Sequence, residues 1–416
     1  MDKNAPKKLH VLIIVNRLYE WSQNFITREL VELNSQGVEV YIGARQIVER
    51  DDLTEAETSL QANFILIPEN PFTPRYLWRH FKFEVKHPVN SFRAWMHFFS
   101  FGHKRPLKIG RSLVCFFRAA AIAEIIITQK INLIHAHFLT APTETALYLS
   151  TLTQIPFGCT AHAMDIYKDN SGIQKKILQA KYIATCTMAN ARHLKNLNAG
   201  VSSKIFTNYH GIQSTNRDHK STSQDYPFLF LAVGRLTPKK GFSYLLEACK
   251  DMSMQGYHFK CRIVGRGPLE ESLKTHIQQL NIQDRIELIG YFPPHKMAKI
   301  YESSHVLVVP SVIESNGDRD GLPNVCLEAM SYGLPIIGSN ISGIPEGVSD
   351  NVNGKLVAPG DSRELSEAMV SFFDLDQRER MGKAAIHLVE EKFNLRNNVR
   401  QLKCIMEQFQ KETCVA

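Results

Sequence analysis

The sequence predicts an α/β protein built from two doubly wound parallel sheets. Apolar runs typical of buried strands alternate almost throughout the chain with stretches of helical periodicity, which is the pattern of repeated strand–helix–strand units. The alternation forms two series, separated by a polar stretch at residues 213–226. Because 416 residues are too many for one hydrophobic core, we expect two domains of roughly 150–200 residues each.

The first series begins with residues 9–15, a continuous apolar run of the kind that a strand buried on both faces requires. A helix is expected over 22–36, with Ser22 as its N-cap and Gly37 closing it. The further strands are expected at 38–44, 131–137, 156–162, 182–185 and 204–209, and the further helices at 143–153 and 188–199. This series predicts an N-terminal domain over residues 1–212.

The second series predicts a C-terminal domain over residues 227–394. Its strands are expected at 228–233, 259–264, 285–290, 306–310, 335–338 and 354–357, and its helices at 242–252, 270–280, 295–303, 324–332 and 362–373. Parallel sheets of this type bind ligands at the carboxyl ends of their strands. We therefore expect the two domains to face each other across a ligand-binding cleft.

Composition excludes several classes of protein. None of the eight cysteines has C-x-x-C spacing, so neither a zinc site nor a thioredoxin-like motif is indicated, and a reducing compartment fits best. The apolar run at 9–15 is too short for a signal peptide. The most apolar long stretch, 113–128, carries Arg118 and Glu124 and is not expected to span a membrane. These features predict a cytoplasmic protein.

Positive charge is concentrated in residues 72–118. This segment holds ten Lys and Arg residues and one acid, Glu84, whereas the whole chain has a net charge of +8. It also holds twelve aromatic residues, among them Trp78 and Trp95. Such an insertion favours an anionic partner, either the inner face of the plasma membrane or a lipid-phosphate acceptor. A helical insertion with its aromatics packed inward is the alternative, and no nucleic-acid motif accompanies the charge.

The segment Gly234-Arg235-Leu236-x-x-x-Lys240-Gly241 lies between a strand and a helix, where a phosphate site is expected. Arginine can bind two phosphate oxygens at once, and lysine adds a second positive charge. The alternative is a capped turn with solvated cations. Downstream, Gly265 and Gly267 also follow a strand and precede a helix, so they allow either close contact with a nucleotide or a structural turn.

Two carboxylates, Asp320 and Glu328, lie eight positions apart across a loop-to-helix junction. Glu328 falls about one turn inside the predicted helix, where it can accept both ribose hydroxyls. Asp320 lies in the preceding loop and can accept hydroxyls of a sugar. The intervening Gly321-Leu322-Pro323-Asn324 places backbone N–H groups at the helix start, where they favour anions. The alternative, two surface acids beside an amphipathic helix, does not account for this specific Gly-Leu-Pro turn.

These motifs resemble glycosyltransferase family 4, a retaining family with the GT-B fold of two Rossmann-like domains. The resemblance also includes His135-Ala136-His137, Thr160-Ala161-His162-Ala163-Met164-Asp165, His210-Gly211-Ile212 and Gly343-Ile344-Pro345-Glu346. It is dense in the C-terminal half and reaches the N-terminal half at a few points. The segment before Glu328 looks most like bacterial exopolysaccharide and lipopolysaccharide transferases of the colanic-acid type.

The resemblance implies a role for each matching position. Arg235 and Lys240 match the diphosphate-binding pair, and Glu328 matches the ribose-binding acid of an E-x7-E motif. Asp320 occupies the first acid of that motif, normally a Glu, and is one methylene shorter. The implied catalytic set is His137, Asp320, Arg235 and Lys240. The implied donor-binding set is Gly234, Arg235, Lys240, Gly265, Gly267, Gly321, Leu322, Pro323, Asn324 and Glu328.

Acceptor binding is expected from the N-terminal domain. His135 and His137 end one predicted strand, with their side chains on the same face, and His162 ends another. Any one of them could instead be a hydrogen-bonded core histidine. The resemblance implies that His137 lies near the reacting sugar, that His162 and Asp165 form a His-x-x-Asp motif, and that Trp21 and Ser22 contact the acceptor. It also implies that the helix at 395–416, with Leu402 and Met406 on its apolar face, folds back onto this domain.

The expected reaction is transfer of a hexosyl group from an NDP-sugar, with retention, to a hydroxyl of a saccharide acceptor, which a polyprenyl diphosphate could carry. No cofactor and no metal are expected, because no Asp-x-Asp stands at a suitable strand end and no His/carboxylate spacing suits a divalent ion. Two alternatives remain open: a non-hydrolysing sugar-nucleotide epimerase and a catalytically idle sugar-binding protein. A dehydrogenase is disfavoured, since the first strand is followed by Asn16-Arg17-Leu18 and not by a glycine fingerprint.

Overall fold

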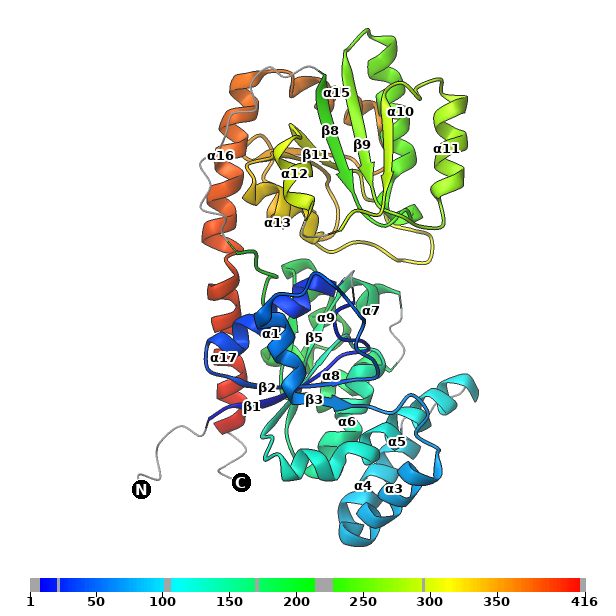
Figure 1. The fold of residues 1–416 in the computed structure, drawn as a ribbon, viewed down its shortest axis with the longest axis vertical. Coiled ribbons are helices and arrows are strands. Elements are labelled where there is room, and N and C mark those ends of the chain that lie inside the picture. The colour runs from blue at the N-terminus through cyan, green and yellow to red at the C-terminus, as the bar shows by residue number, and fades with distance from the viewer. Residues whose placement is uncertain are drawn as a thin grey trace. The chain divides into compact units, whose positions relative to one another are not determined.

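The computed structural model describes residues 8–20, 23–100, 106–168, 172–213, 227–293 and 296–411. The chain divides into two compact units. The first comprises Met1–Cys186, Ala191–Asn208 and Arg396–Ala416, and the second comprises Thr187–Asn190 and Tyr209–Leu395. Each unit is a parallel sheet flanked by helices, so the predicted α/β class with two doubly wound sheets is confirmed (Figure 1). The predicted linker, apart from Gln213, lies outside the described residues.

The first unit contains a seven-stranded sheet in the order β3-β2-β1-β4-β5-β6-β7, with every neighbouring pair parallel. Its strands are β1 (His10–Ile14), β2 (Glu39–Ala44), β3 (Phe64–Leu66), β4 (Leu133–His137), β5 (Phe157–Ala161), β6 (Ile183–Thr185) and β7 (Ile205–Thr207). Every residue of β4 and β5 is buried, which explains why most of their side chains are apolar; the exceptions are His135, His137 and Thr160. The strand order reverses between β1 and β4, and such a reversal is where doubly wound sheets bind ligands.

Ten α-helices pack with this sheet among the described residues. They are α1 (Asn24–Ser35), α2 (Glu55–Ser59), α3 (Pro74–Lys86), α4 (Pro88–Ser100), α5 (Pro106–Thr128), α6 (Ala141–Thr153), α7 (Ala163–Tyr167), α8 (Ile173–Gln179), α9 (Met188–Leu197) and α17 (Leu395–Lys411), with 3-10 turns η2 (Leu60–Asn63) and η3 (Ala199–Lys204). The predicted N-cap Ser22 lies outside the described residues, and Gln23 occupies the cap position of α1.

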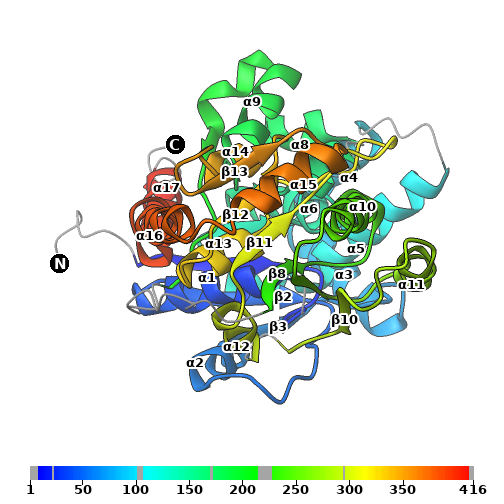
Figure 2. The ribbon, with the colours of Figure 1, turned by 90° about the horizontal axis from the view of Figure 1, so that it is seen from above.

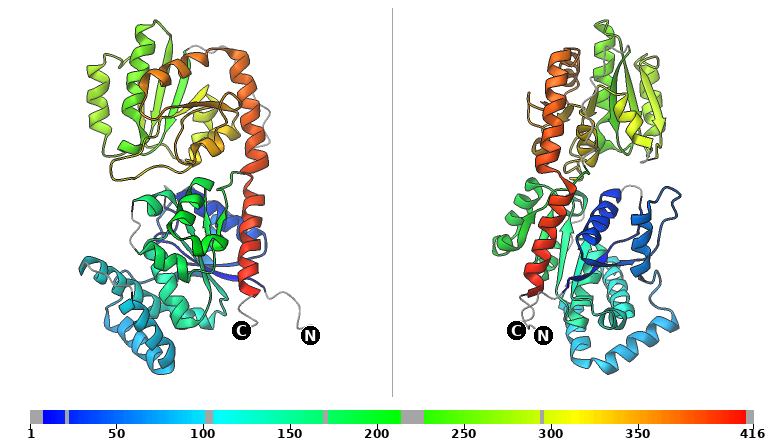
Figure 3. Two further views of the ribbon diagram at one scale, coloured as in Figure 1. Left: turned by 180° about the vertical axis from the view of Figure 1, so that it is seen from behind. Right: turned by 60° about the vertical axis from the view of Figure 1, so that its left-hand side comes forward.

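The helix α17 packs on the first unit (Figure 3). Its residues Leu402 and Met406 are fully buried, and the Phe409 ring stacks on Tyr182 with centroids 5.5 Å apart. Asn208 Nδ2 donates to the carbonyl of Asn398 over 2.8 Å, which ties the helix to the strand end after β7. The apolar spacing of this helix thus corresponds to a buried face against the first sheet.

The segment 72–118 forms the helices α3 and α4 and the first half of α5. Each of these three helices begins with a proline. Proline lacks a backbone N–H, and it fits the first turn because an N–H there would find no partner within the helix. The middle of α5 is buried against the sheet, with Phe116 and Ala119 fully enclosed. Among the described residues, no helix combines the length and apolar character needed to cross a membrane.

The second unit contains a six-stranded sheet in the order β10-β9-β8-β11-β12-β13. Its strands are β8 (Phe228–Val233), β9 (Phe259–Val264), β10 (Ile286–Gly290), β11 (Val306–Val309), β12 (Ile336–Ser339) and β13 (Gly354–Val357). Its helices are α10 (Phe242–Met254), α11 (Glu270–Gln279), α12 (Met297–Glu302), α13 (Asn324–Ser331), α14 (Ile344–Gly347), α15 (Ser362–Ser371) and α16 (Leu375–Lys392), with a 3-10 turn η4 (Pro238–Lys240). The strand order reverses between β8 and β11.

Alternate residues of β8 supply two separate cores. Phe230 and Ala232 point into a core with α10, α11 and α15, whereas Leu231 joins a core with α12, α13, α14 and α16 (Figure 2). The sheet is therefore covered on both faces, which leaves the strand ends as the places where polar groups can gather. The loops after β8 and β11, at the point of reversal, are consequently the natural ligand-binding edge.

These two loops lie against each other at Gly241. This residue adopts φ +64°, and a Cβ atom there would stand 1.8 Å from the carbonyl oxygen of Pro310. Val312 N–H also donates to the carbonyl of Lys239 over 2.8 Å. Only glycine permits this approach, because it combines a left-handed backbone with the absence of a side chain.

Replacing Gly241 with alanine is expected to destabilise the second unit more than the same change at Gly256. Both glycines have positive φ, but nothing lies within 4 Å of a Cβ at Gly256. The control should cost about 1 kcal/mol for the backbone strain, and Gly241→Ala about 2–4 kcal/mol because overpacking is added. Differential scanning calorimetry of both variants measures the difference. Equal losses would mean that the two loops do not need this close contact.

Candidate functional site

A buried ion pair lies at the point where the second sheet reverses its order. Lys240 Nζ is 2.8 Å from Asp320 Oδ2. Lys240 ends the short turn η4 after β8, and Asp320 lies in the loop that leads from β11 into α13. The fold therefore brings together two residues that are 80 positions apart in the sequence. This pairing was not part of the sequence prediction, which gave the two residues separate ligands.

Asp320 is held by more than one group. Ser311 Oγ donates to Asp320 Oδ2 over 2.8 Å, and Lys239 Nζ lies 3.8 Å from Oδ1. Burial acts to raise the pKa of Asp320, but Lys240, Lys239 and the hydrogen bonds outweigh it, so the pKa is lowered. The carboxylate is therefore ionised at neutral pH, and it fixes the position of the Lys240 ammonium group.

The cluster as a whole is close to electrically neutral. Lys239 Nζ is 3.0 Å from Asp318 Oδ1, so each of the two lysines faces a carboxylate. Arg235 adds one positive charge: its side chain is exposed and makes no hydrogen bond or ion pair with the described residues. The cationic cradle predicted from Arg235 and Lys240 thus consists of one exposed guanidinium and one ammonium shared with Asp320.

Two helices begin beside this cluster without a side-chain cap. The N-cap of α10 is Gly241 and that of α13 is Pro323, and neither can accept a hydrogen bond from the first turn through its side chain. The free N–H groups of such helix starts attract anions. A diphosphate could thus be bound with backbone donors adding to Arg235 and Lys240.

The glycines after β9 have a structural role in this fold. Gly265 has φ +147°, and a Cβ there would lie 1.9 Å from the carbonyl oxygen of Gly234; one at Gly267 would lie 2.4 Å from that of Leu236. Leu236 N–H also donates to the carbonyl of Arg266 over 3.0 Å. Of the two sequence-based alternatives, close packing against the loop after β8 therefore accounts for both glycines, and nucleotide contact stays a prediction.

Glu328 lies in the second turn of α13 and is partly buried. Tyr301 Oη donates to its Oε2 over 2.9 Å, which holds the carboxylate in one orientation. At the start of the same helix, Asn324 Oδ1 is 2.9 Å from His210 Nδ1. The preceding loop packs on α14, because a Cβ at Gly347 would come within 2.8 Å of Leu322. The predicted donor-binding segment Gly321–Asn324 is thus anchored at both ends.

In the first unit, three polar side chains meet at the corresponding point between β1 and β4. His137 ends β4, and its Nε2 lies 3.2 Å from Glu29 Oε1 on α1. His135 Nδ1 is 2.9 Å from Tyr182 Oη, and its Nε2 is 3.0 Å from Thr160 Oγ1. Burial, and secondly the neighbouring His137, lower the pKa of His135 well below its usual value, so this ring is neutral at pH 7.

His137 has no solvent-accessible surface in this structure. Its ring packs against the rings of His135 and His162, with centroids 5.2 Å and 5.8 Å away. Neither ring nitrogen makes a hydrogen bond with the described residues, although Glu29 lies nearby. Direct contact with a sugar would require a different side-chain arrangement, so the catalytic role of His137 stays a prediction.

Glu29, His135 and His137 also have the ligand types and spacing of a metal site, since their nearest ligand atoms all lie within 4.8 Å of one another. Both nitrogens of His135 are already engaged with Tyr182 and Thr160, however. A metal ion would have to displace these hydrogen bonds in a fully buried place. We therefore assign no metal to this cluster.

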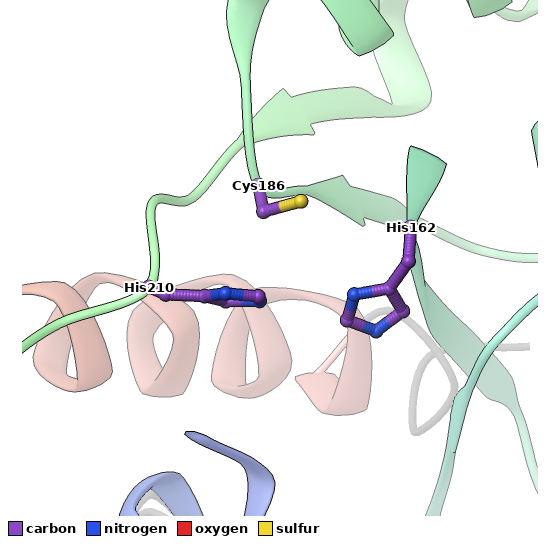
Figure 4. Close-up of side chains that lie close together, drawn as sticks. All are labelled: His162, Cys186 and His210. Atoms are coloured by element: carbon purple, nitrogen blue, oxygen red, sulfur yellow. The ribbon is translucent and has the colours of Figure 1, made fainter. Parts of the chain in front are cut away.

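His162 follows β5 and Cys186 follows β6, and their side chains lie close together at the carboxyl ends of these strands (Figure 4). His210, the third side chain in that view, belongs to the second unit. The His162 ring packs between Phe25 and Phe138, with centroids 5.3 Å and 4.3 Å away. Since only a small part of His162 is exposed, its contact with an acceptor stays a prediction.

Asp165 is engaged by the backbone in this structure, so its contact with an acceptor stays a prediction. It is fully buried, and its two carboxylate oxygens accept the backbone N–H groups of Leu139 and His162. Burial raises the pKa of Asp165 to about 7 although these N–H groups act to lower it. Its position indicates a structural role in fixing the loop that follows His137.

The same loop is held from its other side by a buried lysine. Lys176 Nζ donates to the carbonyls of Leu139 and Thr140 over 2.7 Å and 3.4 Å, and it lies 3.6 Å from Glu144 Oε2. Phe138, which precedes these residues, has φ +74°. This strained loop belongs to no strand or helix, so its backbone polar groups lack the partners of regular structure. Side chains from α6, α7 and α8 supply hydrogen bonds and charge there instead.

The remaining expected acceptor residues, Trp21 and Ser22, lie outside the described residues. Sequence reasoning missed Lys176, Ser311 and Tyr301. Ser311 follows β11 almost directly, so a polar residue at a strand's carboxyl end could have been noticed. Nothing in the sequence marks Lys176 as buried or Tyr301 as the partner of Glu328.

Comparison with known proteins agrees with this geometry. Residues 213–388, which carry the Lys240–Asp320 pair and Glu328, match the family described as glycosyl transferases group 1. The chain is 36% identical over 183 residues to the putative colanic acid biosynthesis glycosyltransferase WcaL of Escherichia coli K12, over 44% of this chain and 45% of that protein. It is 36% identical over 185 residues to the amylovoran biosynthesis glycosyltransferase AmsK of Erwinia amylovora, over 44% of this chain and 45% of that protein. The chain spans about half the length of the curated relatives it matches.

Solved structures match nearly the whole chain in fold. A glycosyltransferase from Rickettsia africae superposes with a TM-score of 0.69 at 18% identity, covering 98% of this chain and 99% of that one. Anabaena HepE in complex with UDP-glucose superposes with a TM-score of 0.69 at 14% identity, covering 97% and 100%. These likenesses establish the GT-B fold, with its two Rossmann-like domains, for this chain.

The buried carboxyl group of Asp165 is expected to make the stability of the first unit fall as pH rises. Its native pKa of about 7 lies above the unfolded value near 3.8, so between these values the native state holds a proton that the unfolded state has lost. The free energy of unfolding should then fall by up to about 1.4 kcal/mol per pH unit between about pH 4 and 7. Urea unfolding at several pH values measures this slope.

Asp165→Asn should lower stability but flatten that slope, because the amide does not titrate. Asp361→Asn is the control: this exposed acid caps α15 in the second unit, so its removal should leave the slope of the first unit unchanged. A slope that is the same in wild type and Asp165→Asn would contradict the raised pKa.

Proposed function

We propose that the protein is a glycosyltransferase that moves a hexosyl group from an NDP-sugar to a hydroxyl of a lipid-linked saccharide in the biosynthesis of a bacterial surface polysaccharide. The observation that carries the proposal is the Lys240–Asp320 pair at the reversal between β8 and β11. The group 1 family match over this segment and the exopolysaccharide names of the curated relatives support it. We place the donor on the second unit and the acceptor on the first.

In this proposal, the diphosphate of the donor binds between Arg235, Lys240 and the uncapped helix starts. The exposed guanidinium of Arg235 can bind two phosphate oxygens. Lys240 is already oriented by Asp320, so little side-chain entropy is lost when a phosphate binds. As the bond to the sugar breaks, these fixed positive groups stabilise the charge on the departing diphosphate. Glu328, held by Tyr301, would accept the ribose hydroxyls.

Asp320 has a second role in this proposal. Its Oδ2 is engaged by Lys240 and Ser311, while the side-chain partner of Oδ1 among the described residues is Lys239 at 3.8 Å. Oδ1 is thus the atom that could accept a hydroxyl of the transferred sugar. An aspartate in place of the usual glutamate keeps the carboxylate close to Lys240. In this proposal, the one carboxylate both positions the lysine and contacts the sugar.

We propose that the anomeric configuration is retained by attack on the same face from which the diphosphate leaves. Asp320 is an unsuitable nucleophile because its charge is already shared with two lysines. In the step proposed, the acceptor oxygen forms the new bond to the anomeric carbon, the bond to the diphosphate breaks, and a phosphate oxygen takes the hydroxyl proton. The anomeric coupling constant in the NMR spectrum of the product tests this, and an inverted product would exclude it.

The first experiment identifies the donor and separates the three functional alternatives. A thermal-shift panel of NDP-sugars should begin with UDP and UDP-glucose, since HepE was solved with these ligands. A stabilising donor is then incubated alone and with a polyprenyl-diphosphate oligosaccharide. Product that needs the acceptor supports a transferase. An epimerised donor formed without acceptor indicates an epimerase, and binding without turnover or hydrolysis indicates an idle binding protein.

Removing either cation of the diphosphate site is expected to slow transfer by about 10²–10³-fold, the scale of losing one charge-stabilising donor. Arg235→Ala suits this test because the side chain is exposed and its removal leaves the fold intact. Lys240→Gln can still donate a hydrogen bond to Asp320, whereas alanine would leave a buried carboxylate without its partner. Lys383→Ala, an exposed lysine on α16, is the matched control. Near wild-type turnover in both site variants would refute their role.

Glu328→Gln is expected to weaken nucleotide binding about 10–100-fold, because a hydrogen bond to a charged group is lost while Tyr301 keeps an acceptor. Calorimetric titration with UDP measures the change, and Glu367→Gln on α15 is the control. The specific contact is tested with 2′-deoxy-UDP, which should bind wild type and variant with similar affinity. An equal effect of Glu328→Gln on both nucleotides would place the carboxylate away from the ribose.

A further inference from the structure

Exposed apolar side chains gather on the helices α3 and α4. Half of the large apolar residues that the described part of the chain exposes lie between residues 72 and 109. On α3, the exposed residues Leu77, Trp78, Phe81 and Val85 follow a helical spacing that places them on one face. Trp78 is 57% exposed and Phe81 is 54% exposed, and their rings stack with centroids 5.6 Å apart. An exposed apolar face of this kind marks an interaction surface.

Positive charge lies beside this face. Arg75, Arg79 and Lys82 follow one another at the spacing of three and four residues that places them along one flank of α3. Lys82 Nζ lies 5.2 Å above the Trp78 ring. Two other cations of the segment are used internally: Lys86 pairs with Glu124, and Arg118 donates to the carbonyls of Pro68 and Glu69. The cations on the flank of α3 are therefore separate from those that hold the fold together.

The only acid in the sequence of the segment, Glu84, is partly buried and already engaged by neighbouring side chains. Glu84 Oε1 accepts a hydrogen bond from Trp95 Nε1 over 2.7 Å and lies 3.1 Å from His80 Nε2. Trp95 itself packs on Phe116, with ring centroids 4.5 Å apart. The aromatic residues thus divide into an inner group that joins the core and an outer group that includes Trp78 and Phe81. The outer surface of α3 carries apolar and positively charged groups without a carboxylate of its own.

The next helix, α4, repeats the pattern. Val89, Phe92, Met96 and Phe99 are exposed at a spacing of three and four residues. Phe92 and Met96 line a groove of about 470 Å³, together with the cations Arg93 and Lys181. Both helices therefore present an apolar stripe flanked by positive charge.

We infer that α3 and α4 form a docking surface for an anionic lipid bilayer, with α3 lying in the interface. Its apolar face would enter the boundary between headgroups and acyl chains, with Trp78 at the depth that tryptophan prefers. Arg75, Arg79 and Lys82 would remain among the anionic headgroups. The positive charge of Arg75, Arg79 and Lys82 favours an anionic bilayer over a protein partner. A protein that bound through the apolar stripe alone would not need a cationic flank free of acids. The inference goes beyond the proposed function, and its test requires no turnover.

Vesicle flotation tests this surface directly with the full chain. The protein should bind vesicles of phosphatidylglycerol and phosphatidylethanolamine but not vesicles of phosphatidylcholine alone, and added salt should weaken the binding. Arg79→Gln/Lys82→Gln should weaken binding about 25-fold, since each cation near the surface is worth about fivefold. Trp78→Ser/Phe81→Ser should reduce binding at least tenfold. The matched controls, Lys383→Gln and Met254→Ser, are exposed positions of the second unit and should bind like wild type.

Trp78 also serves as its own depth probe. In a Trp21→Phe background, brominated lipids should quench the tryptophan fluorescence, and adding Trp78→Phe should abolish most of that quenching because Trp95, the remaining tryptophan, packs on Phe116. Equal binding to neutral and anionic vesicles, or unchanged binding by both double variants, would overturn the inference. So would sedimentation showing a dimer that Trp78→Ser/Phe81→Ser converts to a monomer, because the stripe would then contact a second copy. UDP binding to every variant is measured by calorimetry. This measurement distinguishes a failure of the membrane inference from a failure of the proposed function, because it does not depend on vesicles.

Discussion

The arrangement of the second unit depends on the ion pair between Lys240 and Asp320. It joins the loop after β8 to the loop after β11 at the one place where the strand order reverses. Burying two charges is costly unless each has its partner and further hydrogen bonds, and here Ser311 and Lys239 complete the carboxylate's surroundings. The glycines around the pair also hold these loops together. Gly241 and Gly265 let neighbouring backbones approach more closely than any side chain would allow.

The pair also changes how the charge of the site is understood. A site built only from free cations would bind any polyanion, including inorganic phosphate. Here Lys240 is fixed and largely compensated by its carboxylate, and Arg235, also in the loop after β8, adds an exposed positive charge. In the proposed function, binding would also draw on backbone N–H groups at helix starts and on Glu328, which favours a ligand with both a diphosphate and hydroxyl groups. The proposed nucleotide-sugar donor has both kinds of group.

In the first unit, buried side chains hold the loop at the end of the sheet. The loop after β4 leaves the sheet with a strained residue, Phe138, and its backbone polar groups are met by Asp165 and Lys176. The histidines beside it are enclosed by aromatic rings and hydroxyl groups. The polar groups at this end of the sheet are thus satisfied by hydrogen bonds within the protein. The helices α3 and α4 are different, because part of their charged and aromatic side chains, Trp78, Phe81 and Lys82 among them, are exposed.

The sequence by itself determined the two sheets. The continuous apolar run of β8 and the alternating pattern of β9 identify these strands at their observed bounds, because side-chain burial follows the strand period. It also predicted that Arg235, Lys240, Asp320 and Glu328 belong to one site, since their motifs follow strands that end at the same edge, and the structure brings Lys240 and Asp320 of this set into contact. It did not reveal β3, which has only three residues, or α16, although Asp374 caps that helix by accepting the N–H of Gln377.

Only the tertiary structure decided which of these groups are paired. The partners Lys240 and Asp320, or Lys176 and Leu139, are far apart in the sequence, and no local pattern encodes such contacts. Burial likewise decided that Asp165 supports a loop while Trp78 faces outward, although both lie in stretches that suggested ligand contact. The physical reason is that periodicity reports which face of an element is apolar, whereas pKa, pairing and accessibility depend on what the other elements place against it.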